Sequence, residues 1–268
     1  MKKLDGLYLI ILAAAIGLQI SMGDIPADFF AFPVNAAILA ALACALAVLY
    51  REKPSMAFAR WLASGRTSIL MLSTLALACV ILGLVTQRPE DSFAGLRNIK
   101  ATWWFVDILL WLIANLIAVL LTRKFRLRFF LNHAGLALAL SGMMLGSPDE
   151  SSEAMAVYRA DTGSGMTMTS FKAEYSPNGM PSGYEARLRI DGRDVTIKVN
   201  HPYARTVFDD VYLVDYDRSR PEPAYCIVET VHQPWKSVIW LGIVMMMLGA
   251  VLLFAQGVSP HKEKEERI

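Results

Sequence analysis

The chain has 268 residues, with 26 Lys and Arg against 24 Asp and Glu, so its net charge at pH 7 is only +2. Hydrophobic residues make up 55% of the sequence and charged residues 19%, whereas soluble domains are about one quarter charged. This composition excludes an ordinary soluble enzyme, and it offers no basic stripe for nucleic acid. Because the apolar residues collect in long runs, the sequence predicts an integral membrane protein.

Six apolar runs are each close to the roughly 20 residues that a helix needs to cross about 30 Å of hydrocarbon. We therefore expect an α-helical integral membrane protein with about six transmembrane helices. The runs cover approximately residues 7–22, 32–50, 68–86, 101–121, 129–146 and 238–256.

The Lys and Arg residues predict the orientation of these runs, because cations resist translocation across the membrane. With the N-terminus in the cytoplasm, the short inner segments hold 13 Lys and Arg, whereas the two short outer loops hold three. Both termini are therefore expected inside. The long segment between the fifth and sixth runs is expected outside.

This long segment, residues 148–235, changes from helical to strand-like patterning. The sequence YEARLRI alternates apolar and polar residues, DGR follows, and DVTIKV alternates again, which is typical of a β-hairpin around Asp191 and Gly192. The stretches VYLVDY, AYCIVETV and MTSFKAEY are further candidate strands. We therefore expect a small extracytoplasmic all-β domain, inserted between helices five and six.

Three cysteines, Cys44, Cys79 and Cys226, stand far apart, and the sequence contains no CxxC or CxxCH motif. The chain therefore offers no thiol–disulfide pair and no motif for covalent haem attachment. Any redox chemistry would have to come from a partner.

One ionisable side chain, His133, lies inside the fifth run, about 6 Å along the helix from its cytoplasmic end. A polar ring in a membrane helix is a functional candidate by default, and neutral imidazole is a common protein ligand of haem iron. The alternative is an interhelical hydrogen bond, with a contribution from the neighbouring Asn132. A metal centre at His133 would need its opposite axial ligand from another polypeptide.

Other polar or aromatic residues have simpler explanations beside any functional one. His201 precedes a proline in VNHPY, so it either stabilises a turn or serves as a ligand. Trp103 and Trp104 begin the fourth run, where indole rings favour the membrane interface. Asp107 is close enough to that interface to be hydrated. Asn115 fits a hydrogen-bonding role in helix packing.

Several of these stretches, in this order, resemble the ResB (CcsB) family of System II cytochrome c assembly factors. The resemblance covers about residues 59–256, but two additional helices precede it and the outer domain is small for the family. It rests on the stretches ARWLASGRTSILMLSTLALACVILGLVTQ, WWFVDILLWLIANLIAVLLTRKF, FLNHAGLALALSGMMLGS, VTIKVNHPYARTVFDDVYLVDYD and PWKSVIWLGIVMMMLGAVLLF.

The resemblance implies a non-catalytic membrane subunit of a cytochrome c synthase, which binds haem b, delivers it across the membrane and presents apocytochrome c for haem attachment. His133 matches the family's haem-ligating histidine, and His201, Trp103 and Trp104 are secondary candidates. The implied partners are a ResC/CcsA-like membrane protein, apocytochrome c and a thioredoxin-like thiol reductant. The implied location is the bacterial inner membrane.

The same resemblance divides the chain into five parts. They are two additional N-terminal helices (1–58), ResB-like helices with the haem-ligand candidate (59–147), the β-domain (148–235), a C-terminal transmembrane helix (236–257) and a cytoplasmic tail (258–268). Two alternatives remain. One is a haem-free scaffold whose β-domain docks a partner protein, and the other is a transporter subunit, which the lack of acidic residues at mid-membrane disfavours.

Overall fold

The computed structural model describes residues 2–88, 93–160, 163, 165–175, 181–220 and 222–255. These residues form two compact units, a helical unit from Met1–Pro148 and Val238–Ile268 and a β unit from Asp149–Ser237. The expected cytoplasmic tail, residues 258–268, lies outside the described part of the chain.

Five helices of the described chain are long and apolar enough to cross a membrane, namely α1, α2, α4, α5 and α7. Helix α6 has 19 residues but is not among these five, because Arg128, Asn132 and His133 interrupt its apolar sequence. A sixth crossing therefore stays a prediction. The helices are α1 (Lys2–Met22), α2 (Val34–Glu52), α3 (Ala57–Leu62), α4 (Gly65–Leu84), α5 (Trp103–Thr122), α6 (Leu127–Leu145) and α7 (Lys236–Ala255), with short 3-10 turns at Ala27–Phe30, Phe93–Gly95, Ile99–Ala101 and Ser147–Asp149.

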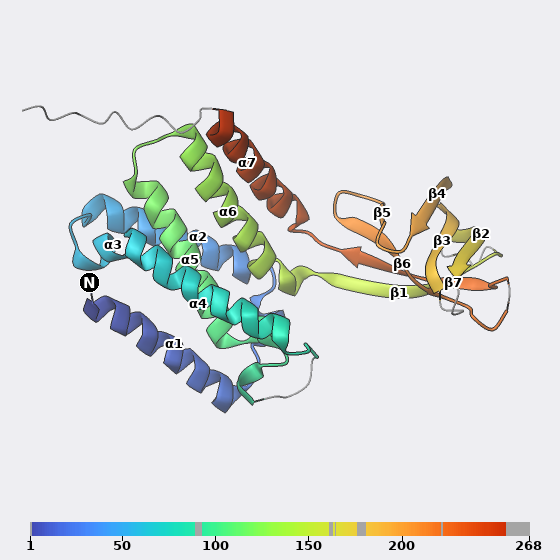
Figure 1. Ribbon diagram of the computed structural model, residues 1–268, viewed down its shortest axis with the longest axis horizontal. Helices are drawn as coiled ribbons and strands as arrows, with labels where there is room; N and C mark the ends of the chain where they lie inside the picture. Colours follow the sequence, from blue (N-terminus) through green and yellow to red (C-terminus); the bar gives the residue numbers. More distant parts are fainter. Residues whose placement is uncertain are drawn as a thin grey trace, which may run out of the picture. The chain divides into compact units, whose positions relative to one another are not determined.

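Helix α5 is the centre of the helical unit, and α1, α2, α4 and α6 pack around it (Figure 1). Half of its apolar stretch is buried, against 11–17% for the other four candidate spans. The other helices therefore leave most of their apolar surface for lipid or for a partner, as expected of spans in a small bundle.

Polar contacts fix both ends of α1 against the bundle. Near its start, Asp5 accepts a hydrogen bond from the indole of Trp61 at 2.8 Å and pairs with Arg66 at 2.6 Å. At its other end, Gln19 is 4% exposed and accepts a hydrogen bond from the backbone N–H of Trp103 at 3.1 Å. Helix α1 therefore runs from the start of α4 to the start of α5, so it is parallel to α4 and antiparallel to α5.

Helices α6 and α7 pack through glycines on both sides. A Cβ added to Gly242 would lie 2.5 Å from the carbonyl oxygen of Gly135 and 2.7 Å from the backbone nitrogen of Ala139. A Cβ on Gly249 would lie 2.7 Å from Oδ1 of Asn132. Small residues at such spacing let the two backbones touch, which is a common way of joining membrane helices.

The β unit consists of two antiparallel sheets, which confirms the prediction of a separate all-β region. One sheet has the strand order β1-β7-β6-β5 and the other β2-β3-β4. The predicted hairpin is β3–β4, and its two turn residues, Asp191 and Gly192, have φ of 49° and 79° as a tight hairpin requires. The strands are β1 (Ser151–Tyr158), β2 (Met166–Tyr175), β3 (Pro181–Ile190), β4 (Arg193–Lys198), β5 (Tyr203–Ala204), β6 (Asp209–Tyr216) and β7 (Tyr225–His232).

The β unit has its own hydrophobic core, to which both sheets contribute. Leu188 and Ile197 come from the three-stranded sheet, and Val211, Cys226 and Val228 come from the four-stranded sheet; all five are fully buried. This alternation of buried and exposed positions along the strands is what the sequence pattern indicates.

Candidate functional site

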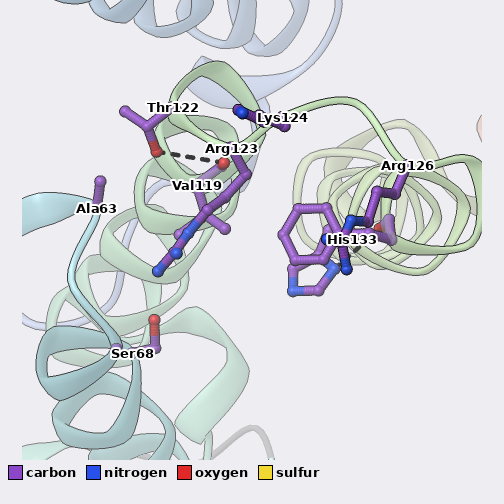
Figure 2. Close-up of a pocket in the computed structure, with 10 residues that line it drawn as sticks. Ala63, Ser68, Val119, Thr122, Arg123, Lys124, Arg126 and His133 are labelled. Carbon is purple, nitrogen blue, oxygen red and sulfur yellow. Dashed lines mark hydrogen bonds between the residues drawn. The ribbon is translucent and has the colours of Figure 1, made fainter. Parts of the chain in front are cut away.

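A cavity of about 630 Å³ lies at the end of the helical unit where α5 ends and α4 and α6 begin (Figure 2). Its volume is within the range of about 300–1,000 Å³ that is typical of sites for cofactors and small ligands. The lining residues are Ala63, Gly65, Ser68, Val119, Thr122, Arg123, Lys124, Arg126, Phe129 and His133.

His133 is held in one orientation by its own helix. Its Nδ1 lies 2.9 Å from the carbonyl oxygen of Phe129, and its ring stacks on the Phe129 ring with 3.9 Å between centroids. In the neutral ring, donation from Nδ1 to this carbonyl leaves Nε2 with a lone pair, so the bond orients Nε2 as a possible ligand. Among the described residues, Nε2 has no hydrogen-bond partner.

Among the described residues, His133 makes no interhelical hydrogen bond of the kind that its alternative role as a packing group would use. The bond of His133 runs to Phe129 within α6, and Asn132 likewise donates to the carbonyl of Arg128 in the same helix, at 3.0 Å. Asn132 instead lies against Gly249 of α7. The two neighbouring polar side chains therefore serve different faces of α6, as their 100° separation requires.

The wall of the cavity formed by α4 and α5 is fixed by a buried amide. Asn115 is 1% exposed; it donates to the carbonyl of Leu62 at 2.5 Å and accepts from the hydroxyl of Ser68 at 2.9 Å. Ser64 caps α4 by accepting from the N–H of Thr67. Asn115 therefore has the packing role expected of it, and it also positions Ser68 on the cavity wall.

The turn between α5 and α6 makes one side of the cavity strongly basic. Arg123, Lys124 and Arg126 all line the cavity, and none of the described residues that line it is acidic. No ion pair joins any of the three to a carboxylate of the described residues. Figure 2 shows Arg123 extending from α5 and Arg126 extending on the side of His133.

The donor set at this site fits haem iron rather than a metal ion held by side chains alone. Within the described part of the chain, no group of three or more His, Cys, Asp or Glu side chains could hold a metal ion. Haem iron takes four of its ligands from the porphyrin and needs only one or two from protein. A single oriented imidazole beside a cavity of this size satisfies that requirement.

The secondary candidates Trp103 and Trp104 lie at the opposite end of α5, about 24 Å along the helix from Val119. The indole of Trp103 donates to the carbonyl of Gly23 at 3.1 Å, and that of buried Trp104 donates to the carbonyl of Ala94 at 3.0 Å. Both therefore stabilise loops at that end and do not contribute to the cavity at His133.

Asp107 is half-buried on α5. One of its carboxylate oxygens is buried and has no hydrogen-bond partner among the described residues. The reason is that α5 is the central helix, so even a residue near its end is covered by neighbouring helices.

His201, the third secondary candidate, belongs to the β unit and pairs with Lys198 through backbone hydrogen bonds. It lines a smaller cavity of about 280 Å³ together with Glu185 and Lys198. Those two side chains form an ion pair at 3.0 Å, and hydrogen bonding to Lys198 holds the pKa of Glu185 below its usual range. The bridge supports the turn-stabilising role for His201.

Sequence reasoning identified His133 but missed its surroundings. It assigned Arg123, Lys124 and Arg126 only to the cytoplasmic flank, and it gave Phe129 no role. A signal was present, because Phe129 precedes His133 by four residues and therefore lies on the same helix face. Nothing in the sequence showed that α4 would close the other side of the cavity.

One family model covers this part of the chain. The model of the ResB-like family matches residues 125–230, which include α6 and His133. None of the curated proteins that were compared matches the chain. Among solved structures, the chain is similar to a protein titled "Cytochrome c Heme Lyase CcmF", with 16% identity and a TM-score of 0.36. The similarity covers 82% of this chain but only 38% of that one, so the chain spans well under half of its length.

Proposed function

We propose that this protein is a membrane subunit that binds haem b through His133 during the assembly of c-type cytochromes. The observation that carries the proposal is the oriented imidazole of His133, whose Nδ1 is bonded to Phe129 and whose ring lines a cavity of about 630 Å³. The match of residues 125–230 to the ResB-like family supports the same conclusion.

In this proposal, His133 supplies one axial ligand through Nε2, and a histidine of a ResC/CcsA-like membrane partner supplies the other. Phe129 covers one face of the imidazole and limits its rotation. Ala63, Val119 and Phe129 supply the apolar part of the cavity wall. Bound haem b supplies the vinyl groups to which the CxxCH thiols of an apocytochrome c add.

The β unit, in the same proposal, faces the outer side of a bacterial inner membrane, and both chain termini face the cytoplasm. There the β unit holds the apocytochrome or the partner. The described cysteines are Cys44, Cys79 and buried Cys226, so the chain brings no thiol pair of its own. A separate thioredoxin-like protein therefore keeps the CxxCH thiols reduced, and this subunit itself is not catalytic.

The test is a visible spectrum of the full-length protein purified with its membrane partner. We expect a Soret band that His133→Ala removes and that added imidazole restores, because free imidazole can occupy the position of the missing ligand. His201→Ala is the matched control and should leave the band unchanged. A band of normal position and intensity in His133→Ala would contradict the proposal and favour the haem-free scaffold.

A further inference from the structure

Within the described part of the chain, the basic side of the cavity has no acidic residue to balance its charge. Three cations, Arg123, Lys124 and Arg126, line it without an ion pair to any carboxylate of the described chain. The start of α6 adds positive charge, because its N-cap residue Arg126 makes no capping hydrogen bond with its side chain. Like charges gathered around a cavity repel one another, so a ligand that carries anionic groups would be stabilised there.

We propose that Arg123, Lys124 and Arg126 bind the carboxylates of the ligand whose iron His133 coordinates. This inference rests on the proposed function and names the part of haem that these residues recognise, its two propionate carboxylates. Arginine is suited to the task, because its planar fork of N–H donors matches a carboxylate.

The spacing along α6 supports this assignment. Arg126 precedes His133 by seven residues, or about two helical turns, and both line the same cavity. A ligand with a metal at one position and carboxylates at its edge can therefore contact both residues. The cavity consequently selects a porphyrin that carries free acid groups over one without them.

Membrane lipids carry anionic phosphates that could contact the same cations, so the experiment has to separate the two sources. Arg128 provides a matched control in the same basic segment. It does not line the cavity at His133 but a separate hollow with Arg126, Leu127 and Leu252. Removing the charge of Arg128 therefore measures how haem binding responds to the loss of a nearby cation that does not line the cavity.

The experiment uses the full-length protein with its partner, produced under haem limitation and placed in nanodiscs of neutral phosphatidylcholine. Haem and haem dimethyl ester are titrated separately, and the Soret shift gives each dissociation constant. We expect Arg123→Gln and Arg126→Gln each to weaken haem binding about tenfold, the cost of losing a charge-assisted hydrogen bond. Binding of the ester should be weak in the unmodified protein and unaffected by either substitution.

Two further variants guard against trivial explanations. Arg128→Gln should bind haem like the unmodified protein. Arg126→Lys keeps the charge and should recover most of the affinity that Arg126→Gln loses, which an unfolded variant could not do. All variants should show the same thermal unfolding midpoint within about 2 °C.

Three outcomes would overturn the inference, and they differ from one another. If haem binds through His133 but the arginine variants and the dimethyl ester bind equally well, this inference fails and the proposed function stands. If those variants keep haem affinity but, in native mass spectrometry before transfer to nanodiscs, have lost the phosphatidylglycerol that co-purifies with the unmodified protein, the cations bind lipid phosphate. If the unmodified protein binds no haem, the proposed function fails as well.

Discussion

The contact between α6 and α7 gives the sharpest stability prediction, because a single methyl group at Gly242 would meet backbone atoms rather than side chains. The Cβ of alanine there would lie 2.5 Å from the Gly135 carbonyl oxygen and 2.7 Å from the Ala139 nitrogen, whereas ordinary contact begins at 3.4 Å. The helices would have to separate by about 0.9 Å, the difference between 3.4 Å and 2.5 Å. Backbone atoms cannot rotate away as the end of a side chain can.

Two opposing terms set the size of the effect. Overpacking of a close contact costs about 1–3 kcal/mol, whereas replacing glycine by alanine within a helix gains up to about 1 kcal/mol. A Cβ added to Gly17, inside α1, would have no atom within 4 Å. Gly17→Ala therefore measures the gain in helix propensity without any overpacking. We therefore expect Gly242→Ala to be less stable than Gly17→Ala by about 1–3 kcal/mol, since the helix-propensity gain is common to both.

The assay is reversible unfolding of the purified full-length protein in mixed micelles, followed by circular dichroism, with Gly17→Ala as the control. Gly142→Ala should fall between the two, because its added Cβ meets the side chain of Ile239, at 2.7 Å, rather than backbone. If Gly242→Ala proved as stable as Gly17→Ala, α6 and α7 would not touch through these glycines, and the argument would be refuted.

Two further predictions concern buried groups. Asn115→Ala should lower the free energy of unfolding by about 1–3 kcal/mol, because the carbonyl of Leu62 loses its donor. Ser68→Ala should lower it by less. If Asn115→Ala unfolds in micelles with the same free energy as the unmodified protein, this prediction is wrong. Burial raises the pKa of Cys226 to about 12, so only about one Cys226 thiol in 10⁴ is ionised at pH 8. A water-soluble maleimide should therefore label Cys226 only after the protein is denatured. Rapid labelling of the native protein would show that this core is open.

The fold was predictable where one periodicity dominates the sequence. The β3–β4 hairpin follows from strict alternation around Asp191 and Gly192, and the long apolar runs gave the helices. Strand β1 was missed, because SSEAMAVY has no such alternation and only its pairing with β7, which is distant in sequence, defines it as a strand. The two-residue strand β5 was missed for the same reason, since only its pairing with β6 defines it.

The candidate site likewise has one part that local sequence predicts and other parts that depend on how the helices pack. His133 was predictable, because an imidazole in an apolar helix is costly and local sequence shows it. The cavity beside it was not predictable, since it depends on how far the starts of α4 and α6 lie from the end of α5. The burial of one carboxylate oxygen of Asp107 likewise depends on α5 being the central helix, and no local pattern shows which helix occupies the centre.

The position of α1 has a consequence for how the protein is made. Gln19 meets its partner, the N–H of Trp103, 84 residues later in the chain. At about 5–20 residues per second, the ribosome needs about 4–17 s to supply that partner. During this interval the amide oxygen of Gln19 lacks the N–H of Trp103, while its NH2 group can already donate to Asp24, so nascent chains stalled before Trp103 should be the form most readily captured by a membrane insertase.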